Sequence, residues 1–554
     1  MEYRLLTMIS AFLLLGCSIL ARANTPGSVA SDSTQAQQGA ASQPVATTQP
    51  VGQTKQEVHF NVDEYQVHGN SHLLSQIEFE KAVYPYLGPY RTADDVEAAR
   101  AALQKTYRDK GFPFVAVEIP QQKVGSGVIV LQVVKNPVGR LRVHGSRYFS
   151  LDEIKREAPS LSEGTVPNFS QVTHDVAILN QLPDRQITPS LHQGILPGTV
   201  DVDLTVKDTP PVHASLELNN RYSANTTPLR INGSASYDNL WQLGHSVGGS
   251  FQISPENINE VEVFSGYYLA RIPNVNWLTL MLQGTDQNSN VNTLGGIGVA
   301  GKGSTIGGRA VFTLPSKKDF FESISLGFDY KHNTQDLQVG GADNMTPITY
   351  YPLSAAYSGT WLKKDVSETD LNASVIANVS AISSDTAEFD LNRSGASGSF
   401  IYFRGDLSHT HELPEGFQIY GKLQGQAANG PLVSNEQISA GGLGTVRGYL
   451  ESEVLGDNGV LASGEFRSPS LTTLLGKSVD EWRFYIFYDW GLVSIDQSLP
   501  QQQATFQLAS TGVGTRLKLI GHLNGSLDVG FPLDTGPNTG LYSPHLTFRL
   551  WADF

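Results

Sequence analysis

The sequence predicts a transmembrane antiparallel β-barrel of about 16 strands, preceded by two small α+β domains. Three observations support this fold class. From about residue 209 onward, apolar and polar residues alternate along segments separated by Gly, Asn, Asp and Pro, as in barrel strands. After the first twenty residues, no apolar run approaches the ~20 residues of a membrane helix. Before residue 209, strands and amphipathic helices follow each other in an order that occurs twice.

Residues 1–23 have the features of a secretory signal peptide. Arg4 precedes an apolar stretch from Leu5 to Leu20, and Ala21-Arg22-Ala23 fits the small-x-small pattern of a cleavage site. The alternative is a lipoprotein signal in which Cys17 is acylated. Cys17 is the only cysteine in the sequence, so cleavage after Ala23 would leave a mature chain without a disulfide.

Residues 24–56 are rich in Ser, Thr, Gln, Ala, Pro and Gly and poor in large apolar side chains. Such a segment cannot bury enough surface to offset the conformational entropy that is lost on ordering. We therefore expect a flexible leader that links the signal peptide to the folded domains. A short helix around Thr34–Gln43 is the one candidate for an ordered plug.

Residues 57–136 are predicted to form the first α+β domain. A capping box at Thr92–Asp95 opens a helix, and Gly111 ends it. The apolar residues Val96, Ala99, Leu103 and Tyr107 share one face of this helix. That face is expected to pack on three strands at residues 59–67, 114–119 and 128–134.

Residues 137–208 repeat this pattern and are predicted to form a second domain of the same type. The segments Val67–Ser71 and Val143–Ser146 both read Val-His-Gly and then Asn-Ser or Ser. We expect strands at 140–143, 186–191 and 200–206 and helices at 151–158 and 170–180. Two tandem copies of one domain follow from the repeat.

Residues 209–554 are predicted to form the barrel. About 344 residues, at roughly 20 for each strand and its connection, allow about 16 strands, and bacterial single-chain barrels have an even number. In the last segment, apolar side chains alternate up to a terminal aromatic residue. This ending resembles the signal that outer-membrane barrel assembly machinery reads, so that machinery is an expected partner through Phe548, Leu550 and Phe554.

The composition excludes several functions. The formal net charge of -15 argues against binding nucleic acid, which requires a basic surface. Gly296–Gly301 matches G-x-G-x-x-G and precedes Lys302, but Gly303 stands where a phosphate loop has Ser or Thr. The histidine pairs His68/His72 and His409/His411 have no third ligand cluster in the sequence. We therefore expect no metal, no cofactor and no enzymatic activity.

Several segments of the repeated domains resemble the POTRA domains of two-partner secretion transporters, the TpsB proteins that export haemolysins and filamentous haemagglutinin. The segments are Tyr107–Pro113 and Val117–Gln121 in the first domain, and Leu179–Asn180, Pro183–Arg185 and Leu196–Asp203 in the second. The resemblance covers about residues 57–554. It implies two periplasmic POTRA domains and an outer-membrane barrel.

The most specific motif of the resemblance is Val446-Arg447-Gly448-Tyr449, which follows a glycine-rich segment. In this superfamily the motif lies at the tip of a long loop that folds back into the barrel lumen. Its partner is a Phe-x-Asp-x-Gly motif on the barrel wall, represented here by Phe487, Asp489 and Gly491.

The residue pattern around Asp489 points independently to the lumen. Phe484, Ile486, Tyr488 and Trp490 form an apolar face suited to lipid, so the intervening residues Phe487, Asp489 and Gly491 should face inward. An arginine can engage a lumenal carboxylate with two parallel hydrogen bonds. We therefore expect a pair between Arg447 and Asp489, with Glu465 as a companion. The alternative is that Arg447 is a solvated loop residue and Asp489 an ordinary pore-lining charge.

The resemblance implies an outer-membrane pore that exports a large TpsA-type exoprotein, such as an adhesin, a haemolysin or a contact-dependent toxin. The POTRA domains would bind the unfolded exoprotein in the periplasm, and export would proceed without ATP. Two alternatives are an outer-membrane insertase of the same superfamily, which usually carries more POTRA domains, and a passive porin. Outer-membrane lipid is the expected environment of the barrel.

Overall fold

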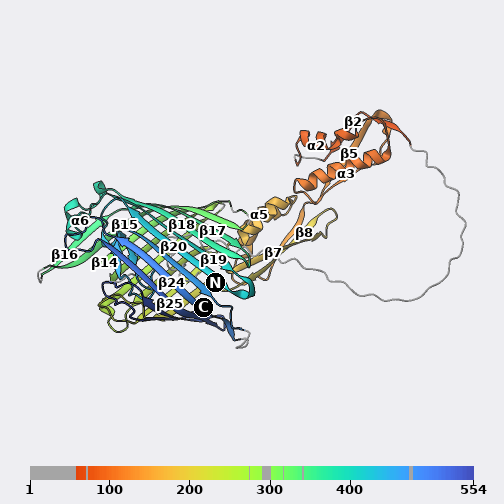
Figure 1. Cartoon of the computed structure of the whole chain (residues 1–554). Coiled ribbons are helices and arrows are strands. Elements are labelled where there is room, and N and C mark those ends of the chain that lie inside the picture. The colour runs from red at the N-terminus through yellow and green to blue at the C-terminus, as the bar shows by residue number, and fades with distance from the viewer. Residues whose placement is uncertain are drawn as a thin grey trace, which may run out of the picture. The chain divides into compact units, whose positions relative to one another are not determined.

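The computed structural model describes residues 58–69, 73–273, 275–289, 301–315, 317, 319–339, 342–472 and 478–554. The predicted signal peptide, the leader with its plug candidate, and most of the 296–301 glycine motif lie outside the described residues. The chain divides into two compact units, one ending at Thr209 and the other beginning at Pro210. Figure 1 colours the first unit from red to yellow and the second on to blue. Among the described helices, none is both long and apolar enough to cross a membrane.

The first domain is a three-stranded sheet covered by two helices. Its elements are β2 (Glu64–His68), α2 (Gln76–Val83), α3 (Ala93–Asp109), β4 (Val115–Glu118) and β5 (Val128–Lys135). The sheet order is β2-β5-β4, with β2 parallel and β4 antiparallel to β5. This order places β2 and β4 at the two edges of the sheet.

Two features of this domain differ from the sequence prediction. Helix α2 was not predicted; it is preceded by the N-cap residue Ser75, whose side chain forms a capping box with Glu78. The strand expected at residues 59–67 is two strands, because the backbone N–H groups of Asp63 and Glu64 both donate to the carbonyl of Gly127. The first part, β1 (Phe60–Val62), turns away and pairs with β3 (Gly88–Arg91).

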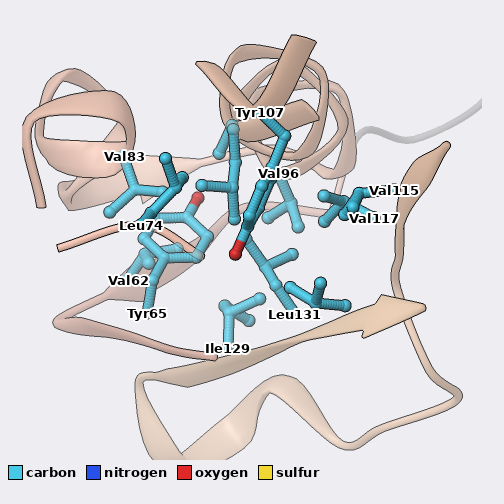
Figure 2. Packing of buried hydrophobic residues seen from close by; sticks show 13 residues of the cluster. Val62, Tyr65, Leu74, Val83, Val96, Tyr107, Val115, Val117, Ile129 and Leu131 are labelled. Atoms are coloured by element: carbon cyan, nitrogen blue, oxygen red, sulfur yellow. The ribbon is translucent and has the colours of Figure 1, made fainter. Parts of the chain in front are cut away.

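The core of the first domain lies between α3 and the sheet, as Figure 2 shows. The four residues predicted to share a face of α3 are all at most 5% exposed. Tyr107 is fully buried, and burial raises its pKa to about 12. Each buried Val, Leu or Ile stabilises the domain by roughly 1.5–3 kcal/mol relative to an exposed position.

The second domain has the same order of elements. These are β6 (Val138–His144), α4 (Leu151–Arg156), α5 (Phe169–Leu179), β7 (Arg185–Gln193) and β8 (Val200–Asp208). The sheet order is β6-β8-β7, with β6 parallel and β7 antiparallel to β8. The match in strand order and direction extends the internal repeat from sequence to topology.

The two domains meet where α3 ends and α5 begins. The Asn168 side chain caps α5 and donates to the carbonyl of Lys110 at 3.0 Å. The backbone N–H of Phe169 donates to the carbonyl of Gly111 at 2.7 Å. Gly111 has φ +90, and a Cβ there would come within 3.0 Å of the Asn168 side chain. Two carbonyls just beyond the end of α3 thus accept hydrogen bonds from the start of α5, one from the capping side chain and one from a free backbone N–H group.

The second unit is a closed antiparallel barrel. Its strands are β9 (Val212–Asn219), β10 (Arg230–Leu240), β11 (His245–Ile253), β12 (Val261–Ile272), β13 (Val275–Ser289), β14 (Gly301–Thr313), β15 (Phe320–Val339), β16 (Ala342–Tyr350), β17 (Leu353–Lys363), β18 (Ser367–Asn378), β19 (Phe400–Glu412), β20 (Gln418–Ala428), β23 (Asn458–Arg467), β24 (Val479–Ser494), β25 (Thr505–Leu519), β26 (Leu523–Pro532) and β27 (His545–Asp553). Short 3₁₀ helices occur in both units. Those of the first unit are η2 (Tyr84–Tyr86), η3 (Val124–Ser126) and η4 (Pro159–Leu161), and those of the second are η5 (Ile258–Glu260), η6 (Ser380–Ile382), η7 (Pro414–Gly416) and η8 (Ser434–Glu436).

The described residues form 16 barrel strands, as predicted, because β16 and β17 are two halves of one strand. Both halves pair with β15 in a single continuous register. They are separated by Tyr351 and Pro352, and proline has no N–H to contribute to the ladder. The barrel closes where β27 pairs with β9.

The two faces of the barrel wall differ as the alternation predicts. In β24, Phe484, Ile486 and Tyr488 are 44–59% exposed on the outer face, and Trp490 is half-buried. The residues between them are buried inside. Short connections such as Trp241–Gly244 lie at one end of the barrel, and the long connections at 379–399, 429–457 and 495–504 lie at the other.

Candidate functional site in the barrel lumen

The connection between β20 and β23 is a long loop that folds against the inner face of the barrel wall. Its stems form a hairpin, β21 (Ile438–Ala440) and β22 (Val454–Gly456). The tip, residues 441–453, is largely buried against β23, β24 and β26. Gly441 and Gly442 have φ +105 and +94, a backbone conformation that favours glycine and allows the sharp turn into the tip. We call residues 429–457 the lumenal loop.

Arg447 at the loop tip is bound to the wall strands by its guanidinium and its backbone. Its Nε and Nη2 donate to the two carboxylate oxygens of Asp489 at 2.8 and 2.9 Å. Its backbone N–H donates to the same carboxylate at 3.0 Å. Nη1 donates to Glu465 at 2.6 Å, and Nη2 also reaches the hydroxyl of Ser463 at 3.1 Å. We call this arrangement the tip lock.

Both carboxylates of the tip lock are deeply buried. The side chains of Asp489 and Glu465 are 0% and 1% exposed. Glu465 also pairs with Arg467 at 2.7 Å and with Arg516 at 3.3 Å, so its charge is shared among three arginines. Removing one partner of a buried ion pair costs roughly 3–5 kcal/mol, because an uncompensated charge stays behind.

Each residue of the Phe-x-Asp-x-Gly motif has a separate role in holding the tip. The ring of Phe487 lies under the Arg447 guanidinium, 3.7 Å from ring centroid to Cζ, which adds a cation–π contact. Asp489 supplies the carboxylate. Gly491 provides room, because a Cβ there would come within 3.1 Å of Val446 Cγ2 and 2.8 Å of Leu461.

The residues that flank Arg447 in its motif also contact the wall. Gly448 has φ +89 and lies against Gly530 of β26; a Cβ on Gly530 would come within 2.6 Å of Gly448 Cα. The Tyr449 hydroxyl lies 2.6 Å from the carbonyl of Asp534 and 3.0 Å from that of Ala509, so one proton serves two acceptors. The motif is therefore a set of four wall contacts with Arg447 as the charged one.

Two further carboxylates follow the motif and were not singled out from the sequence. Glu451 accepts a bidentate pair from Arg221, at 2.6 and 3.1 Å, in the β9–β10 connection. Glu453 accepts from the backbone N–H of Asn538 and the hydroxyl of Thr539 in the β26–β27 connection. The sequence contains one signal that could have identified them. The two acidic residues of Glu-Ser-Glu lie shortly after a motif that is expected to be buried.

The structure brings together Arg447, Asp489, Phe487, Gly491 and Glu465, which the sequence analysis selected as one site. The sequence analysis missed Ser463, Arg467, Arg516 and Asp528, which lie against Arg447 or Glu465. The four lie on inward-facing positions of β23, β25 and β26. The alternation along each strand predicts that these residues face inward. It predicts the same for every other lumenal charge, so it could not single them out.

The C-terminal strand carries the residues of the predicted assembly signal. Leu550 and Phe554 are 49% and 70% exposed on the outer face, and Phe548 is half-buried on the same face. Phe554 exchanges two backbone hydrogen bonds with Ala214, at 2.9 and 3.0 Å. The terminal aromatic residue thus lies at the seam where the barrel closes.

Two family models match the sequence. The model of the haemolysin secretion/activation protein ShlB/FhaC/HecB matches residues 198–517. The model of the ShlB-type POTRA domain matches residues 60–136. Together they cover the first domain and most of the barrel.

Two proteins that are similar in sequence are described as transporters, and the structure of one of this type superposes on the chain. The chain is 22% identical over 504 residues to a heme/hemopexin transporter protein, HuxB, of Haemophilus influenzae, covering 88% of this chain and 86% of that one. It is 23% identical over 516 residues to the outer membrane transporter CdiB of Escherichia coli, covering 86% and 79%. A solved structure of CdiB from Escherichia coli superposes with a TM-score of 0.64 at 18% identity, covering 92% and 93%.

Proposed function

The chain belongs to the haemolysin secretion/activation protein family ShlB/FhaC/HecB, and on that premise we propose how its lumenal loop controls export. Members of this family are outer-membrane transporters of two-partner secretion, and the chain is the pore of such a system. Its POTRA domains are periplasmic, and its client is a TpsA-type exoprotein. The barrel therefore passes an unfolded polypeptide from the periplasm to the cell surface.

We propose that the tip lock holds the pore closed at rest. The observation that carries this proposal is the buried contact of Arg447 with Asp489 and Glu465. The loop tip occupies space against the inner wall, so an exported chain requires the tip to move. A lock made of exchangeable hydrogen bonds and ion pairs has two discrete states, which a moving part requires.

The POTRA domains offer edges at which an extended client can add a strand. In the first domain β2 and β4 are edge strands, and in the second β6 and β7 are. Backbone hydrogen bonds at an edge are tolerant of sequence, and side-chain pockets add selectivity. We propose that the client binds by this mode before it enters the barrel.

We also propose a biogenesis role for the last strand. Phe548, Leu550 and Phe554 would be read by the barrel assembly machinery, and exposure of Leu550 and Phe554 on the outer face supports this proposal. The same apolar face would contact outer-membrane lipid.

The test of the tip lock is secretion of the client by Arg447→Ala and Asp489→Asn variants. We expect the amount of secreted client to fall by about tenfold or more, because a tip that has lost its buried partner no longer returns to one defined position between rounds of export. Client in the culture medium is measured by immunoblot, and heat-modifiable migration of the barrel is measured in the same membranes.

The matched control is Arg309→Ala. Arg309 of β14 forms an equivalent bidentate pair with Asp329 of β15, at 2.7 and 2.8 Å, on the inner wall and outside the tip lock. Its loss should leave secretion near the wild-type amount. Full secretion by both tip-lock variants would reject the proposed role of the lock.

A further inference from the structure

The lumenal loop is also held at its extracellular end, by contacts separate from the tip lock. β9 follows the periplasmic domains, so strands that run outward end at the long connections. The connections at 379–399, 429–457 and 495–504 therefore lie on the extracellular side. The first of these carries a short helix, α6 (Thr386–Asn392), and we call residues 379–399 the lid.

An apolar cluster seats the lid on the wall and on the start of the lumenal loop. Phe389 of α6 is fully buried, and its ring meets that of Tyr350 edge to face, at 5.8 Å between centroids. Phe400, Leu432 and Val433 belong to the same buried cluster. The lid therefore packs on the segment that leads into the lumenal loop.

A single buried carboxylate joins the lid to both stems of the loop. Asp457, directly after β22, is 0% exposed and accepts two hydrogen bonds from the Arg393 guanidinium, both at 2.8 Å. It also accepts from the backbone N–H groups of Leu432 and Asp496, at 2.8 and 2.7 Å, and from Gln437 at 3.2 Å. One side chain thus ties together three extracellular connections.

The Arg393 side chain also binds the other two connections directly. Its Nη1 also donates to the carbonyl of Leu432 at 2.7 Å, and its Nη2 to that of Asp496 at 3.1 Å. The backbone of Asp457 bonds to the wall: its N–H donates to the carbonyl of Ser494 in β24, and its carbonyl accepts from the Gln426 side chain in β20. The side-chain bonds of Arg393 and Asp457 go to the loops. The cluster can therefore separate without breaking the barrel.

Space beside the cluster permits such a separation. A cavity of about 280 Å³ is lined by Arg393 of the lid, Gln437 and Leu455 of the lumenal loop, and Ile495 and Gln502 of the β24–β25 connection. The three connections therefore adjoin an open volume and are not packed against one another on every side.

We infer that Arg393 and Asp457 form a latch that positions the lid and keeps the extracellular mouth closed, separately from the tip lock. The inference rests on the proposed function, since it concerns gating of the same pore. The tip lock holds the loop against the wall, and the latch holds its stems under the lid. Full opening requires both to release.

The latch is tested by conductance of the purified full-length protein in planar lipid bilayers, without client. Arg393→Ala and Asp457→Asn should each raise the fraction of time that the pore is open by about tenfold or more. Arg393→Lys keeps the charge but not the two-pronged geometry, so its open fraction should be intermediate. Glu388 is an exposed carboxylate on α6, so the open fraction of Glu388→Gln should match that of the wild type.

A second measurement guards against variants that fail to fold. The double variant Arg393→Cys with Asp457→Cys lacks the latch, so its open fraction should be raised; joining the two thiols with a cleavable bifunctional reagent should suppress these openings until the linker is reduced. Wild-type open fractions in folded Arg393→Ala and Asp457→Asn, or no effect of the linker, would overturn the latch. Failure of the tip lock would instead show as normal secretion by Arg447→Ala, which this measurement does not use.

Discussion

The interior of the first domain and the interior of the barrel around the lumenal loop bury side chains of different chemistry. In the domain, the residues buried between helix and sheet are apolar or aromatic, including Leu103, Tyr107 and Leu131. In the barrel, the buried residues around the lumenal loop include the charged Arg447, Glu465, Asp489 and Asp528, beside a small apolar cluster. An apolar core has no partner-specific bonds to exchange, whereas an ionic interior can swap partners. The apolar core of the first domain therefore suits a part that stays folded, and the ionic contacts of the lumenal loop suit a part that moves.

The largest loss of stability is expected from a cavity in the core of the first domain. Leu103→Ala should lower the free energy of unfolding of the first domain by roughly 2–5 kcal/mol, because Leu103 is fully buried. Limited proteolysis of the full-length protein at rising urea concentrations measures the loss. Leu103→Met keeps the volume and should cost less than about 1.5 kcal/mol. Equal losses for both substitutions would show that packing does not dominate this core.

A smaller effect is expected where the loop tip needs space. Gly491→Ala places a methyl group against Val446 and Leu461, so the tip must shift, at a cost of roughly 1–3 kcal/mol. Faster hydrogen exchange of residues 441–453 in the variant measures the loosened tip. The control is Gly421→Ala, where a Cβ meets nothing within 4 Å. An unchanged exchange rate in Gly491→Ala would indicate that the tip is not tightly seated.

The smallest effect concerns charge on the surface of the first domain. A hydrogen bond from Lys110, with others from Ser75, lowers the pKa of Glu78 from 4.5 to about 2. Because the pKa of Glu78 is lower in the folded state than in the unfolded state, the ionised carboxylate stabilises the folded state at pH values above the unfolded pKa. This stabilisation is lost as the pH falls from about 4.5 towards 2. Glu78→Gln should therefore flatten the pH dependence of α2 stability in that range, as followed by hydrogen exchange. The same steep dependence in the variant would contradict this assignment.

Local patterns were sufficient for much of the fold. Alternation identified the barrel, and the capping box at Thr92 located α3. Helix α2 was missed although Ser75 and Glu78 form a capping box like the one that located α3. The interruption between β16 and β17 depends on one proline within a long strand, which could not be distinguished from a turn. The 16-strand count held because this interruption leaves the register intact.

The candidate site was only partly accessible from sequence. Asp489 was placed inward by alternation, and the paired motifs selected Arg447 as its partner. The contacts of Arg221 with Glu451 and of Arg393 with Asp457 join residues 230 and 64 positions apart. Neither pair lies in a motif or on a regular strand pattern. Only the three-dimensional arrangement of the loops brings them together.

The seam between β9 and β27 constrains how the protein is made. The residues that close the barrel, Ser215–Asn219 and Arg549–Asp553, are at opposite ends of the barrel sequence. Glu217 and Arg549 add a buried bidentate pair across the seam, at 2.9 and 2.7 Å. Contacts of such long range form slowly, and no closed wall exists until the final residues have been synthesised. Until then the unpaired edges need protection in the periplasm, and loss of even the last strand would leave an open sheet.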